Sequence, residues 1–87
     1  MATKHSELDK LVGTLRRERD ELQVRLHLAK AEAKDQWSEL EQKWQGIEAK
    51  LPSVKREVGS AAENIVAALK LAAEEVERGY ANIRKLL

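Results

Sequence analysis

The sequence predicts an all-α protein in which two long helices form an antiparallel coiled-coil hairpin. Of its 87 residues, 36% are charged and only 3% are aromatic, which is typical of helices that bury one narrow stripe and expose the rest. Apolar residues recur at helical spacing over about residues 7–51 and again over 54–86. Pro52, a strong helix breaker, separates the two patterns. We therefore expect one helical-hairpin domain spanning residues 1–87.

The first helix is expected over about residues 7–51. Ser6 can cap its N-terminus, and Asp9 places a negative charge in the first turn. At about 100° per residue the apolar side chains share one face, and a rise of about 1.5 Å per residue makes the helix roughly 65 Å long. The residues of this stripe are Leu8, Leu11, Leu15, Leu22, Leu26, Ala29, Ala33, Trp37, Leu40, Trp44, Ile47 and Leu51.

The turn is expected at residues 52–53 and the second helix at about 54–86. Pro52 disfavours helical dihedral angles at the residue before it, and Ser53 can cap a new helix. Three glycines, Gly46, Gly59 and Gly79, are expected inside helices, the last permitting a close approach between them. The stripe of the second helix is Val54, Val58, Ala61, Ala62, Ile65, Leu69, Ala72, Val76, Tyr80, Ile83 and Leu87.

Folding the chain back at Pro52 sets residues whose numbers add to about 105 side by side. Trp44 then faces residues 61–62 and Trp37 faces residues 67–68, all alanine. This match of bulky to small side chains favours a hairpin over one continuous helix. The predicted intramolecular core is Leu22, Leu26, Trp37, Leu40, Trp44, Ile47, Val58, Ile65, Leu69, Val76, Tyr80 and Ile83.

The segment before Glu18 is expected to have no partner in its own chain, because Leu87 at the end of the second helix lies opposite residue 18. This overhang of roughly 25 Å needs another protomer, and a homodimer would form a four-helix bundle. Val24 and Leu28 are further candidate contacts. The predicted oligomer interface is Leu8, Leu11, Val12, Leu15, Val66 and Leu71.

Charge and motif content disfavour an enzyme, a cofactor or metal site, and a nucleic-acid partner. The formal net charge is +1, and the dense cluster of residues 16–21 neutralises itself. Cysteine is absent, and His5 and His27 have no further ligand at metal-binding spacing. The acidic group of Glu74, Glu75 and Glu77 lacks a cleft that would raise a pKa, so a solvated face is expected.

Trp37 and Trp44 lie seven residues apart on the first stripe. They could stack on a ligand or anchor a membrane interface, but Leu40 and Ile47 share their face, which favours two core residues.

A membrane-spanning segment is not expected. The polar start does not read as a signal peptide, and the longest apolar run covers only residues 65–69, so we expect a cytoplasmic protein. The Ala-rich second helix could lie on a membrane surface, but Lys55 and Arg84 flank one side of its stripe and Glu57 and Glu75 the other. Opposite charges on opposite flanks favour a neighbouring helix.

Two segments, residues 25–37 (RLHLAKAEAKDQW) and residues 79–85 (GYANIRK), resemble small, uncharacterised bacterial helical proteins of coiled-coil, apolipoprotein-like type. The resemblance implies a bacterial origin and transfers no functional residue.

The function expected from the sequence is that of a non-enzymatic coiled-coil scaffold or protein–protein interaction module. Its partner is itself, as a homodimer or higher oligomer, or another helical protein. The alternative is reversible binding to a membrane surface or lipid inclusion through the amphipathic helices.

Overall fold

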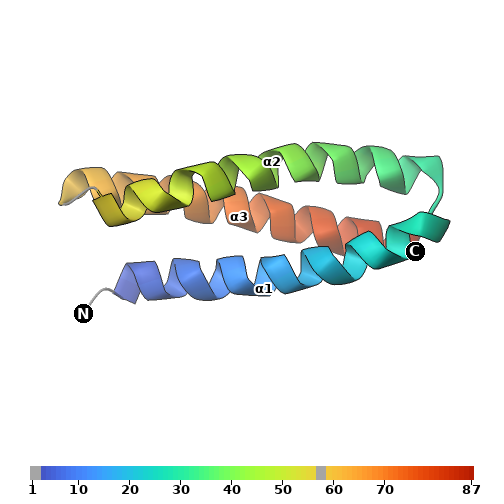
Figure 1. Ribbon diagram of the computed structural model, residues 1–87, viewed down its shortest axis with the longest axis horizontal. Coiled ribbons are helices and arrows are strands. Elements are labelled where there is room, and N and C mark those ends of the chain that lie inside the picture. The colour runs from blue at the N-terminus through green and yellow to red at the C-terminus, as the bar shows by residue number, and fades with distance from the viewer. Residues whose placement is uncertain (1–2, 57–58) are drawn as a thin grey trace.

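A computed structural model describes residues 3–56 and 59–87 of the chain. Within these ranges the chain forms three α-helices, α1 (Thr3–Arg25), α2 (Ala31–Arg56) and α3 (Ser60–Leu86), with the short 3₁₀-helix η1 (Leu26–Leu28) after α1. The helices lie side by side in an elongated bundle of 45 × 19 × 16 Å (Figure 1). The α1 and α3 helices run in one direction and α2 in the other. The predicted all-α class is confirmed.

The chain first reverses at residues 26–30, so the expectation of one continuous helix over residues 7–51 was wrong. Ala29 has an extended backbone (φ −82°, ψ 157°), and its N–H donates to the carbonyl of Leu26 at 3.1 Å. No Gly or Pro marks this break, and its residues are mostly good helix formers. The reversal brings α1 alongside α3, where its apolar stripe is buried, and such tertiary burial outweighs local helix propensity.

The second reversal lies between Arg56 and Ser60, so the turn expected at residues 52–53 was also wrong. Pro52 stands inside α2, where a proline costs about 3 kcal/mol. Val54, two residues further on, is only 6% exposed, and its burial helps to offset that cost. Gly59 caps α3 at φ 66° and ψ −141°, a backbone conformation that residues other than glycine rarely adopt. It is therefore a cap, and not the helix-interior residue expected from the sequence.

The register between α2 and α3 follows from the later turn. Residues whose numbers add to about 118 lie side by side, as the ion pair of Lys43 with Glu75 shows. Trp37 accordingly stacks on Tyr80 and does not face residues 67–68, so the predicted register was wrong. The close approach expected at Gly79 is confirmed, because a Cβ added there would lie 2.6 Å from Cδ1 of Leu40.

The core runs along the bundle between all three helices and buries no charged side chain among the described residues. Its buried apolar residues are Leu8, Val12, Leu15, Leu22, Leu26, Ala33, Leu40, Trp44, Ile47, Val54, Ala62, Val66, Leu69, Ala73, Val76, Tyr80 and Ile83.

Candidate interaction surface

The residues predicted to form an oligomer interface lie mostly in the core of their own chain. Leu8, Val12, Leu15 and Val66 are each at most 4% exposed, and Leu11 packs against them. The expected overhang before Glu18 does not exist, because α1 turns back at residue 26 and lies along α3. Of the six predicted interface residues, Leu71 is exposed, at 66%.

The residues predicted to form the intramolecular core lie at the interior of the bundle, although their partners differ from those expected. Trp37 and Ile65 are partly buried, and Val58 lies outside the described residues. The buried members are Leu22, Leu26, Leu40, Trp44, Ile47, Leu69, Val76, Tyr80 and Ile83.

The two tryptophans contact side chains of other helices. Trp44 is 1% exposed, and the guanidinium carbon of Arg16 lies 5.8 Å from its ring centroid. The ring centroids of Trp37 and Tyr80 are 5.6 Å apart. Both indoles thus join α2 to a neighbouring helix.

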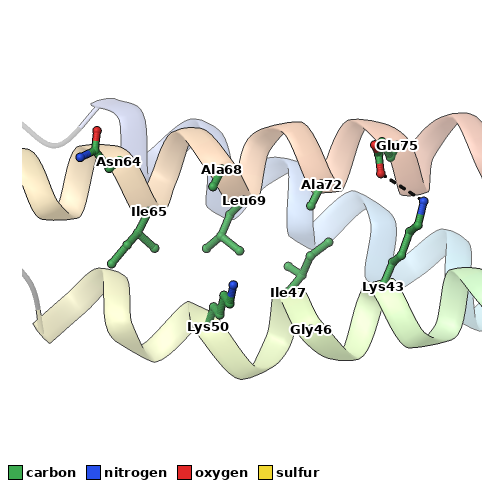
Figure 2. A pocket seen from close by; sticks show the side chains of 10 residues that line it. All are labelled: Lys43, Gly46, Ile47, Lys50, Asn64, Ile65, Ala68, Leu69, Ala72 and Glu75. Atoms are coloured by element: carbon green, nitrogen blue, oxygen red, sulfur yellow. Dashed lines mark hydrogen bonds and ion pairs between the residues drawn. The ribbon is translucent and has the colours of Figure 1, made fainter.

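A groove with an apolar floor lies on the outer face between α2 and α3, with a volume of about 420 Å³. Figure 2 shows the side chains of Ile47 from α2 and of Ile65 and Leu69 from α3 pointing into it. Ala68, Ala72 and Gly46 also line it. Because these three residues are small, the two helices leave the groove unfilled.

Charged side chains border the groove. Nζ of Lys43 lies 3.1 Å from the Glu75 carboxylate and closes one end of it. The side chain of Lys50 reaches into the groove from α2 (Figure 2), and among the described residues it has no carboxylate partner. Beyond Lys43 the groove continues as a more polar cleft, lined by Gln36, Glu39, Leu40, Lys43, Glu75, Arg78, Gly79 and Asn82.

Exposed apolar side chains also gather at the opposite end of the bundle from the N-terminus. Leu28 is 96% exposed and lines a shallow cavity together with Leu86 and Leu87. Val24 on α1 is 71% exposed. The cavity beside Leu28, Leu86 and Leu87 is also lined by Arg25 and Lys30, so its walls are more polar than those of the groove.

The interhelical ion pairs fix the alignment of the three helices. Nε and Nη2 of Arg19 on α1 donate to the two carboxylate oxygens of Glu41 on α2, at 2.7 and 2.5 Å. Hydrogen bonding to Glu41 raises the pKa of Arg19, against the lowering effect of burial. Lys70 on α3 pairs with Glu7 on α1 at 3.1 Å. Lys43 on α2 pairs with Glu75 on α3, and not with Glu39 four residues before it on its own helix.

Among the described residues, one buried side-chain polar atom has no hydrogen-bond partner, the hydroxyl oxygen of Tyr80. Burial raises the pKa of this phenol, and the negative charge of Glu41 raises it further. The hydroxyl belongs to a side chain that is 0% exposed, so it faces the packed interior and not the groove.

The described residues hold no group of three or more His, Asp or Glu side chains placed to bind a metal ion. In the same part of the chain, no helix combines the length and the apolar character that a bilayer crossing demands.

Sequence reasoning missed the groove because it depends on the register of α2 against α3. The signal was present as small residues at helical spacing, Ala68 and Ala72, and as Lys43 and Lys50 seven residues apart. Only the observed pairing places these two sets on one face.

Comparison of the chain with models of known protein families, with curated proteins and with solved structures found no match.

Proposed function

We propose that this protein is a non-enzymatic helical interaction module that acts by associating with a second copy of itself. The observation that carries the proposal is the α2–α3 groove, a hollow of about 420 Å³ with an apolar floor. Apolar surface left open in this way is stabilised when a partner covers it.

The chemistry around the groove supports binding of a protein surface. Its border carries both signs of charge, with Lys43 and Lys50 on α2 and Glu75 on α3. Interfaces between proteins combine an apolar centre with a polar rim of this kind. A surface for anionic lipid would instead carry Lys and Arg along the whole border.

The buried residues before Glu18 no longer support self-association, so the proposal rests on a different surface from the one expected from the sequence. Leu71 belongs both to the interface predicted from the sequence and to the surface around the groove, since it is exposed and lies beside the groove residues Ala68 and Ala72.

Sedimentation equilibrium of the full chain over about 1–200 µM tests the proposal, since interfaces of this size class bind in the micromolar range or tighter. We expect a concentration-dependent mass that approaches twice the 9.9 kDa of one chain. A mass that stays at 9.9 kDa throughout would contradict self-association. Co-sedimentation with anionic vesicles at low salt tests the lipid alternative, for which we expect no binding.

A further inference from the structure

The α2–α3 face carries charges whose signs are opposite on its two helices. At one level, α2 presents Lys43 and α3 presents Glu75. About one turn further along, the signs are exchanged, with Glu39 on α2 and Arg78 on α3, both lining the polar cleft. Among the described residues neither Glu39 nor Arg78 has an ion-pair partner. At these two levels, therefore, the charge on α2 complements the charge on α3.

The outer edges of this face differ in size at one shared level. Leu71 lies three residues after Ala68 and four before Glu75, so it shares their side of α3. Gly46 stands in the same way between Lys43 and Lys50 on α2. The register places Leu71 and Gly46 level with each other on opposite edges. A Cβ added at Gly46 would meet no atom within 4 Å, whereas Leu71 projects into solvent.

We propose that two copies of this chain pack their α2–α3 faces together about a twofold axis parallel to the helices. This inference rests on the proposed self-association and adds its surface and orientation. Such an axis keeps every residue at its own level and sets α2 of one protomer against α3 of the partner, so four antiparallel helices surround the joined grooves. Lys43 then faces the partner's Glu75, and Glu39 faces the partner's Arg78. Leu71 packs over the partner's Gly46.

The other twofold arrangement, with its axis perpendicular to the helices, is disfavoured by charge. Centred on the groove, it sets α2 against the partner's α2 in antiparallel fashion. Lys43 would then lie against the partner's Lys50, and like charges brought together at an interface are destabilising. Leu71 would also meet the partner's Leu71 and leave both Gly46 positions unfilled.

The size of the face suits a dimer. The bundle is 45 Å long and 19 Å wide, so one side offers roughly 850 Å² before its relief is counted. An interface of standard size buries about 800 Å² on each partner. The whole α2–α3 face is therefore needed, including the apolar groove and the polar cleft beside it.

An exchange of side-chain size between the two edges tests the contact. Sedimentation equilibrium would compare the unchanged chain with Leu71→Ala, Gly46→Leu and the variant that carries both. Each single change should weaken the dimer about tenfold or more, the first by removing the projecting side chain and the second by a clash with the partner's Leu71. The double variant should recover most of the affinity. Val24→Ala, at an equally exposed site on α1, is the matched control and should leave the dissociation constant unchanged.

Cysteine cross-linking tests the orientation, because the chain has no cysteine of its own. Gly46→Cys and Leu71→Cys proteins, mixed and mildly oxidised, should form a disulfide between the two different variants. Each variant oxidised alone should stay uncross-linked. The perpendicular arrangement predicts the reverse, with cross-links inside each single variant.

The outcomes separate the two proposals. A monomeric chain contradicts both. A dimer that is insensitive to Leu71→Ala and Gly46→Leu, or one that is lost on Val24→Ala, overturns this interface and leaves self-association standing. Circular dichroism of each variant verifies that the helical fold is retained. If Leu71→Ala unfolds, Leu71→Gln takes its place.

Discussion

The indole of Trp37 stacks on the phenol of Tyr80, with ring centroids 5.6 Å apart and 20° between the ring planes. This contact aligns α2 with α3, because it fixes which residues of the two helices stand level with each other. A turn at Pro52 would instead have placed Trp37 opposite residues 67–68, which are alanines about twelve residues nearer the start of α3. The alignment in turn sets Gly79 against Leu40 and creates the groove.

Removal of the Tyr80 hydroxyl should not destabilise the protein. Tyr80→Phe keeps the ring and its stack on Trp37, and deletes a buried polar atom that has no hydrogen-bond partner. An unsatisfied buried hydroxyl costs about 1 kcal/mol or more, so the free energy of unfolding should stay the same or rise by about that amount. Urea unfolding followed by circular dichroism measures the change. A loss above 1 kcal/mol would show that the hydroxyl has a partner.

Alkaline pH should destabilise the fold through the same residue. The pKa of Tyr80 is raised above its ordinary value of about 10, chiefly by burial. The unfolded chain therefore loses this proton at lower pH than the folded chain. The contribution of the phenol to the free energy of unfolding is thus intact below about pH 10 and is lost as pH rises further.

Absorbance at 295 nm reports this ionisation cleanly, because the chain has one tyrosine. The tyrosinate signal should appear only together with the loss of helix. Tyr80→Phe should show a smaller drop in stability above pH 10. A phenol that titrates near pH 10 in the folded protein would contradict its burial.

Pro52→Ala should stabilise the protein. Because Pro52 lies inside α2 and its ring is exposed, alanine restores a backbone N–H and removes the ring's clash with the preceding turn. We expect a gain of about 1–3 kcal/mol in the free energy of unfolding, measured by thermal melting. If the chain turned at residues 52–53, the same substitution would be neutral or destabilising.

Gly59→Ala should destabilise the protein by about 1–3 kcal/mol, because alanine tolerates φ 66° with ψ −141° poorly. Gly13→Ala is the matched control, since Gly13 lies inside α1 and an added Cβ meets no atom within 4 Å. That change should stabilise by about 0.5–1 kcal/mol. Equal effects at the two sites would show that Gly59 has an ordinary helical conformation.

Leu15→Asp should unfold the whole protein. Leu15 is 0% exposed in the core of its own chain, and a buried carboxylate there costs about 4 kcal/mol or more. A two-helix hairpin with an overhang predicts instead a dissociated protein with its Trp-containing half still folded. Far-ultraviolet circular dichroism separates these results. Val24→Asp, at an exposed site on the same helix, should keep its full helical signal.

The sequence by itself determined the helical class and most of the side chains that turn inward, although Val12, Val66 and Ala73 are buried outside the predicted stripes. Helical spacing of Leu22, Trp44 and Tyr80 with their neighbours marks one face of each helix, and that face is buried whichever helix covers it. This information is local, because it depends on about 100° of rotation per residue and on the preference of apolar groups for burial.

Only the tertiary structure decided where the chain turns and which faces meet. The break at residues 26–30 has no Gly or Pro to announce it, while Pro52 announces a break that does not occur. In both places a local preference of about 3 kcal/mol or less is outweighed by the burial of many apolar side chains at once. The groove depends in turn on the resulting register, which no single segment of the sequence specifies.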